Sequence, residues 1–268
     1  MGNLNVVKLN SKKDRANYIH QLTKDIKALE YMLEQDMIEK SPIRIGAEQE
    51  FCIVNNEFNP NNNSLEILEL INDSHFTTEI GKYNLEINLD PFELKEDCFS
   101  KLHKQLENLL EKAKKVAETK DSKIVLTGIL PTLGLKHISV ENMTKIPRYS
   151  VLDEAIKESR KQDFHIHIKG NDELNLLHDS VMLEGCNTSF QMHLQINPDN
   201  FIDSYNWAQA ISGPILSVCS NSPVLFGKEL WEETRIALFT QSVDTRANSI
   251  LIYEKQSRVS FGSKWETG

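Results

Sequence analysis

The chain has 268 residues, of which 40% are hydrophobic and 26% are charged, and its formal net charge is −9. This composition predicts a soluble globular protein, and the acidic balance argues against a general nucleic-acid binder, which depends on clustered Lys and Arg. No run reaches the roughly 18 apolar residues of a membrane helix, and the polar start of the chain is unlike a signal peptide. We therefore expect a cytoplasmic protein without a membrane partner.

The first half of the chain mixes amphipathic helices with strands. Apolar residues at helical spacing alternate with charges over two long segments, and Pro42 ends the first of them. The segment 55–63 is dense in Asn and predicts a loop. In chain order, we predict a helix at 14–40, a strand at 43–54, a helix at 64–72, a strand at 81–91 and a helix at 97–119.

The second half continues in the same manner, without a repeat. The run 123–131 is apolar on both faces and predicts a central strand. We then expect a helix at 149–161, a strand at 164–170, a helix at 173–184, a strand at 189–197 and a helix at 201–219. We interpret residues 1–268 as a single domain. Because the chain stops without a capped helix or a polar tail, we expect it to be truncated at its C-terminus.

The stretch "YNLEINLDP" at 83–91 alternates strictly between apolar and polar residues. Successive side chains of a strand point to opposite faces, so Glu86 and its polar neighbours share one face. In "IRIGAEQEF" the same rule places Glu48 and Glu50 together. In "SFQMHLQIN" it places His193 and Gln195 on the polar face. Three strands therefore each offer a face rich in carboxylates, amides and imidazole.

Two interpretations of these faces are open. An antiparallel strand with one solvated face alternates by default, and this is the commoner origin of such a pattern for a single strand. Solvated faces usually carry Lys, Thr, Ser and Arg, whereas Arg44 is the only cation on the faces of these three strands. Carboxylates gathered on one sheet repel one another unless cations neutralise them, and hard divalent ions take such ligands. We therefore predict Mg²⁺ or Mn²⁺ on this face, and with it ATP.

Common nucleotide motifs are absent from the sequence. The segment "GKE" at 227–229 lacks the rest of a phosphate-binding loop, and no G-x-G-x-x-G occurs. Two serines in "SNSP" lie outside any nucleophile elbow. These absences leave the acidic sheet face as the main candidate site.

Four motifs taken in order resemble a known family. "GAEQEF", "YNLEINLDP", "SFQMHLQ" and "SNSPVLFGKELWEETRIALF" are similar to carboxylate-amine ligases that include bacterial and plant glutamate–cysteine ligases, within the glutamine synthetase and guanidino kinase superfamily. The resemblance runs from about residue 43 to about residue 246. It implies an α+β fold, with a curved, largely antiparallel sheet whose convex face is covered by helices.

The resemblance also implies a reaction and its cofactors. ATP and two or three Mg²⁺ ions would lie on the concave face, where a substrate carboxylate, often that of glutamate, is phosphorylated and an amine such as cysteine then forms the amide. Relatives often form dimers, so the resemblance leaves a homodimer open, while the sequence itself does not settle the oligomeric state. Two alternatives stay open: a guanidino or amino phosphotransferase on the same sheet, and a catalytically lapsed module that binds ATP and Mg²⁺ and partners another domain.

Residue roles follow from the resemblance at matching positions. Glu86 and Arg235 would act at the reacting centre, with Arg235 near the substrate or the transferred phosphate. A surface arginine paired with Glu232 or Glu233 is the competing interpretation of Arg235. The resemblance implies Gln195, Arg235 and Arg246 as nucleotide contacts. As metal ligands it implies Glu48, Glu50, Glu79, Glu86 and His193. Where relatives carry "H-x-H" on the late strand, this chain has "MHLQ", so an amide replaces one imidazole.

Overall fold

The computed structural model describes residues 6–9, 11–160, 162–246, 257–262 and 264–267. Its helices are α1 (Lys12–Glu34), α2 (Ser64–Ile71), α3 (Cys98–Glu118), α4 (Pro147–Arg160), α5 (Phe201–Cys219) and α6 (Thr234–Ser242). Four short 3₁₀ helices are η1 (Leu135–Ile138), η2 (Val140–Asn142), η3 (Val181–Cys186) and η4 (Pro198–Asn200). None of the helices in the described part of the chain has both the length and the apolar character needed to span a bilayer.

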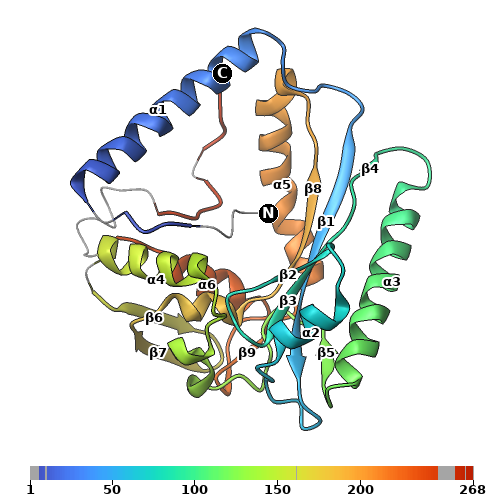
Figure 1. The fold of residues 1–268 in the computed structure, drawn as a ribbon, viewed down its shortest axis with the longest axis vertical. Helices are drawn as coiled ribbons and strands as arrows, with labels where there is room; N and C mark the ends of the chain where they lie inside the picture. The colour runs from blue at the N-terminus through green and yellow to red at the C-terminus, as the bar shows by residue number, and fades with distance from the viewer. Residues whose placement is uncertain (1–5, 10, 161, 247–256, 263, 268) are drawn as a thin grey trace.

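A six-stranded antiparallel sheet forms the centre of the fold (Figure 1). Its long middle strand, β1 (Arg44–Val54), pairs with β3 and β4 along one edge and with β8 and β5 along the other. β2 extends the sheet beyond β3. The remaining bounds are β2 (Phe76–Thr78), β3 (Asn84–Asn88), β4 (Phe92–Glu93), β5 (Lys123–Val125) and β8 (Phe190–Leu194).

Two smaller antiparallel sheets lie outside the central one. β6 (Phe164–Lys169) and β7 (Glu173–His178) form one hairpin, and β9 (Val224–Leu225) pairs with β10 (Lys228–Glu229). The mixture of helices with antiparallel sheets confirms the α+β class. The strands predicted around 43–54, 81–91 and 189–197 and the helices predicted around 97–119, 149–161 and 201–219 are all present.

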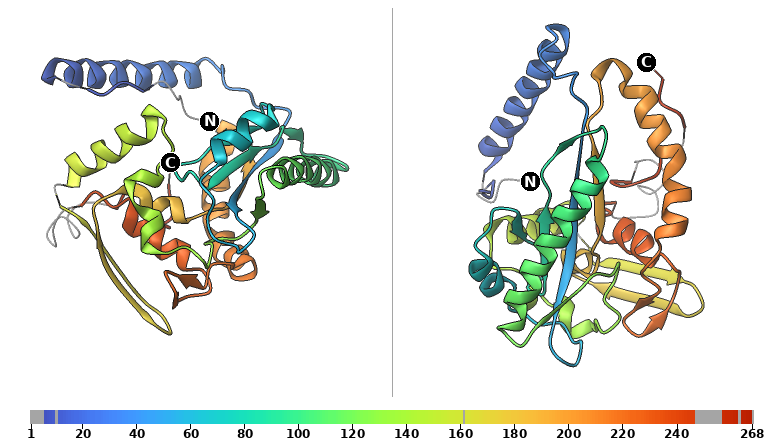
Figure 2. Two further views of the ribbon diagram at one scale, coloured as in Figure 1. Left: turned by 60° about the horizontal axis from the view of Figure 1, so that its bottom comes forward. Right: turned by 90° about the vertical axis from the view of Figure 1, so that its right-hand side faces the viewer.

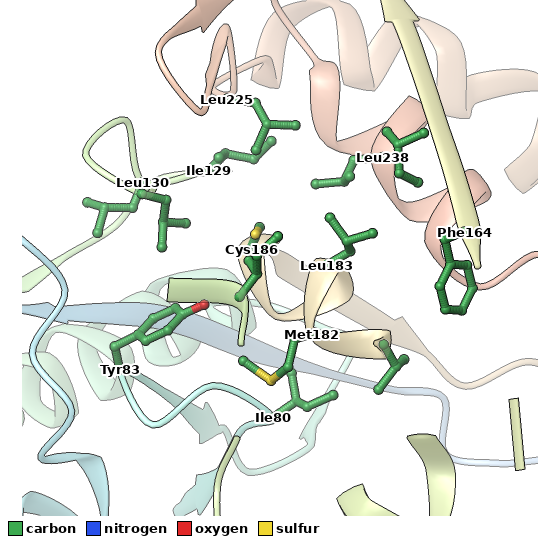
Figure 3. Packing of buried hydrophobic residues seen from close by; sticks show 14 of the residues in the cluster. Ile80, Tyr83, Ile129, Leu130, Phe164, Met182, Leu183, Cys186, Leu225 and Leu238 are labelled. Atoms are coloured by element: carbon green, nitrogen blue, oxygen red, sulfur yellow. The ribbon is translucent and has the colours of Figure 1, made fainter. Parts of the chain in front are cut away.

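Two of the predicted elements are wrong. Residues 173–184 were expected to be a helix but form β7 and then η3, because the alternating residues from Glu173 to His178 pair along their whole length with β6. The central strand expected at 123–131 is only the three-residue β5 at the edge of the sheet. Beyond Val125 the chain leaves the sheet, and Ile129 and Leu130 are buried in a loop whose side chains share a core with those of η3 (Figure 3).

Each face of β1 contacts a different core. Ile45, Ala47, Phe51 and Ile53 pack with α2 and α3 on one face. On the other face, Cys52 and Val54 join a second core that also contains residues of α4, β6, η3 and α6. This second core covers only the C-terminal half of the face. The N-terminal half, from Arg44 to Glu50, therefore stays open for polar side chains.

The contact between β6 and the β10 segment yields a test of the packing. A Cβ atom on Gly170 would lie 2.5 Å from the Leu230 carbonyl carbon and 2.6 Å from its Cα. We expect Gly170→Ala to lower the free energy of unfolding by roughly 1–3 kcal/mol, because backbone must move to admit the methyl group. Gly213→Ala in α5 is the matched control: no atom lies within 4 Å of its Cβ position, and a gain of about 0.5–1 kcal/mol is expected. The urea unfolding midpoints of the two variants measure both changes in stability. Equal midpoints for Gly170→Ala and Gly213→Ala would contradict the close contact between Gly170 and Leu230.

Candidate active site on the open sheet face

Three carboxylates meet on the open half of the central sheet. Glu50 of β1 and Glu86 of β3 are directly opposite one another in the register of the antiparallel pair. Glu79 follows β2, two residues beyond Thr77, which is the partner of Glu86. The period of two therefore turns all three side chains to one face. One carboxylate oxygen from each lies within 4.8 Å of the others.

Hydrogen bonds hold each carboxylate of this triad in place. The Ser189 backbone N–H and hydroxyl donate to one Glu50 oxygen, at 2.7 and 3.1 Å. The Asn88 amide donates to Glu86 at 2.6 Å, and the Ile80 N–H donates to Glu79 at 3.2 Å. The positions of the oxygens are thus set by neighbouring backbone and amide groups before any ligand arrives.

The electrostatics of the triad favour a bound cation. Burial, followed by the negative charges of Glu50, Glu184 and Glu86, raises the pKa of Glu79 to about 9. Burial likewise raises the pKa of Glu50 to about 7. Like charges directly opposite one another in a sheet are destabilising, and carboxylate oxygens are the ligands that Mg²⁺ and Mn²⁺ prefer. The residues present therefore fit a hard divalent ion.

A second pair of candidate ligands lies further along β1. Gly46 is opposite His193 and Glu48 is opposite Gln191 in the pairing of β1 with β8. Nε2 of His193 consequently lies 3.5 Å from a Glu48 oxygen, diagonally across the two strands. Glu48 and His193 share the face of the triad but are not part of the group whose oxygens converge within 4.8 Å.

Arg235 lies beside the acidic face. It sits in the first turn of α6, donates to the Thr188 carbonyl at 3.0 Å and forms an ion pair with Glu233. Arg235 and Glu50 line the same cavity of about 350 Å³. The structure thus combines the two sequence interpretations, since Arg235 is paired with Glu233 and is also close to the candidate site.

Gln195 and Arg246 have partners outside the triad. The Gln195 side chain accepts from Arg44 at 3.1 Å, and Arg44 is in turn paired with Glu39. Arg246 follows α6 and is paired with Asp244 at 2.6 Å. Neither residue lines the cavity that contains Arg235. Their nucleotide-binding roles stay predictions.

The model of glutamate-cysteine ligase family 2 (GCS2) matches residues 44–260, a range that begins with β1 and includes the triad and Arg235. The chain belongs to glutamate-cysteine ligase family 2. Its family is thus one of ligases, and glutamate–cysteine ligases are carboxylate-amine ligases. No curated protein matches the sequence.

Two polar residues of this GCS2 member were not found from the sequence. Glu184 lies in η3 and lines the cavity with Glu50, and burial raises the pKa of its carboxyl to about 7. Asn187 follows η3 and lines the same cavity. A single acidic residue in the apolar run "VMLEGC" was an available signal for Glu184. No comparable signal marks Asn187, because a single Asn near a bend is common.

Proposed function

We propose that this GCS2 member is an ATP-dependent carboxylate-amine ligase that joins the γ-carboxylate of glutamate to an amine such as cysteine, through an acyl phosphate. The observation that carries the proposal is the convergence of Glu50, Glu79 and Glu86 on one sheet face in a chain of this family. Such a set of anionic oxygens is suited to Mg²⁺ or Mn²⁺, which accompanies phosphate in active sites.

The proposed ligands fall into two groups along β1. Glu50, Glu79 and Glu86 would hold one ion, and Glu48 with His193 would contribute to a second. Bound Mg²⁺ would offset the charge of ATP and of the transferred phosphoryl group. The hydrogen bonds from Ser189 and Asn88 fix the carboxylates beforehand, so the chain need not reorganise them as charge moves in the transition state.

Arg235 is proposed to contact the substrate carboxylate or the transferred phosphate. Its guanidinium is planar and can form two parallel hydrogen bonds to such groups. The Thr188 carbonyl and Glu233 hold it beside the cavity, so the side chain is already oriented. Orientation of reacting groups and fixed charge are the main sources of rate in this kind of chemistry.

Product analysis tests the proposal. The full chain is incubated with ATP and Mg²⁺ and with glutamate alone, an amine alone, or both together. We expect sustained ADP and phosphate release only with both substrates, together with a γ-glutamyl amide by mass spectrometry. A phosphorylated guanidine or amine product would identify a phosphotransferase instead. Binding of ATP without turnover in every mixture would identify a nucleotide-binding module.

A further inference from the structure

Helix α1 carries an apolar stripe that the described part of the chain leaves largely uncovered. Five side chains on one side of the helix are 46–61% exposed: Ile19, Leu22, Ile26, Leu29 and Leu33. No residue of α1 is buried, and the helix lies at the periphery of the molecule, apart from the central sheet (Figures 1 and 2). The family match begins at residue 44, so α1 lies outside it. A contiguous apolar surface of this kind marks an interaction site.

The spacing of the stripe is that of a helix-pairing seam. Its steps of three and four residues repeat every seven, with isoleucine at 19 and 26 and leucine at 22 and 29. Side chains at such positions interdigitate with those of a second helix. The seam covers about two heptads, whereas a coiled coil that stands alone typically has about three to four. A stable interface therefore needs further surface beside the helix.

The charges of α1 are self-complementary in one orientation. Residues 12–24 carry four Lys or Arg and one Asp, whereas residues 25–36 carry one Lys and four Asp or Glu. The helix dipole favours the reverse order, so the stability of α1 alone does not explain this distribution. In an antiparallel pair of α1 helices, the basic half of each would lie beside the acidic half of the other. A parallel pair would place like charges together.

A groove at the basic end of α1 supplies the further surface. It has a volume of about 600 Å³ and lies between the start of α1, the segment 6–9 and α4. Ile19 of the stripe and Val151 of α4 both line it. Antiparallel pairing would bring the other end of a second helix toward this groove, where Leu33 and Met37 are exposed apolar side chains. The seam and the groove thus form one continuous surface.

We propose that α1 is a homodimerisation helix, whose apolar stripe packs antiparallel on the same stripe of a second copy of this chain. The two-fold axis would pass near Ile26, the middle of the stripe, so that both copies use the same surface. The end of each helix would enter the groove beside α4 of the other copy. This interface involves neither the acidic triad nor the cavity at Arg235, so it is independent of the proposed ligase function.

Sedimentation equilibrium of the full chain at micromolar concentrations tests the interface. We expect a monomer–dimer equilibrium in wild type. Leu22→Glu combined with Leu29→Glu should weaken dimerisation by at least about 100-fold, because carboxylates would enter an apolar seam. Tyr31→Glu is the matched control: Tyr31 is 58% exposed on the other side of α1, and this variant should dimerise within about threefold of wild type. A monomeric wild type, or equal dimerisation by the double variant and the control, would overturn the inference.

Cross-linking tests the orientation without disrupting the interface. In a Cys219→Ser background, which removes the exposed native thiol, Ile19→Cys and Leu33→Cys chains are treated with a short bismaleimide, separately and mixed. Covalent dimers should form only in the mixture. Cross-linking of Ile19→Cys chains alone would indicate a parallel pair and contradict the proposal.

Two further measurements exclude other origins of a monomeric state. The Leu22→Glu and Leu29→Glu double variant should keep a cooperative melting transition, because no residue of α1 is buried. Wild type should not co-sediment with vesicles of anionic lipid. A wild-type monomer that binds such vesicles through the stripe would identify a membrane surface as its partner and overturn the inference.

Discussion

Glu86→Gln is expected to reduce ligase turnover by at least about 100-fold. Loss of residues that only support a metal ligand typically costs 10–100-fold, and Glu86 is a proposed ligand itself. The substitution keeps the size of the side chain and its position opposite Glu50, but it removes the negative charge that would bind the cation. Steady-state assays with saturating ATP and excess Mg²⁺ measure the effect.

Controls make this expectation specific to the triad. Glu57→Gln changes an exposed glutamate in the loop after β1 and should leave turnover within about twofold of wild type. Glu50→Gln and Glu79→Gln should resemble Glu86→Gln, because the three oxygens lie within 4.8 Å of one another. Full activity in any one of the three variants would exclude that residue from the metal site.

Without divalent ions, the protein is expected to become less stable as pH rises from about 5 to about 9. The folded state raises the pKa of Glu79 to about 9 and those of Glu50 and Glu184 to about 7, from the ordinary glutamate value of 4.5. Between these values the folded state binds more protons than the unfolded state, so the free energy of unfolding falls with pH. The free energy of unfolding falls by about 1.4 kcal/mol per pH unit for each additional proton that the folded state binds relative to the unfolded state. Denaturant unfolding at pH 5, 7 and 9 measures it.

Divalent ions should reverse this loss. Mg²⁺ and Mn²⁺ bind the ionised carboxylates, so the rise in melting temperature that they cause should be larger at pH 9 than at pH 6. NaCl at matched ionic strength should not reproduce the rise. Glu79→Gln should flatten the pH dependence of the metal-free protein, because it removes a carboxyl whose pKa is raised to about 9, compared with about 7 for Glu50. A stability profile that is equally steep in this variant would contradict the assignment.

The faces of the central strands could be predicted from the sequence. In 83–91 and 43–54 the apolar and polar residues alternate with the period of the pleat, so the side of the sheet on which Glu50 and Glu86 lie needs no structure to derive. Burial of Leu85 and Ile87 against α2 and α3 agrees with this period. The position of Glu79 was accessible only from the family resemblance, because Glu79 lies just outside β2.

Features that depend on long-range pairing could not be predicted. The leucines of β7 are compatible with helical spacing, and only the partner strand β6 decides against a helix. The apolar run after Val125 is equally ambiguous, since a buried loop and a buried strand use the same residues. Glu184 and Asn187 reach the cavity through η3, whose position depends on packing against α6 and the loop at Ile129 (Figure 3).

The arrangement of elements around the site explains why it is accessible from one side. α3 covers one face of the sheet, whereas α5 runs beside β8, close to the polar half of β1 (Figure 2). The cavity therefore opens between the sheet and the α5–α6 region, where Leu216 and Phe239 line it. A ligand bound at the triad would adjoin this cavity, because Glu50 belongs to both.

Diffraction from crystals grown with Mn²⁺, recorded at the manganese absorption edge, tests the central claim most directly. We expect an anomalous peak about 2.0–2.3 Å from carboxylate oxygens of Glu50, Glu79 and Glu86. If solution titrations confirm bound Mn²⁺ while the only strong peak lies away from these three residues, the acidic face of the sheet is not the metal site.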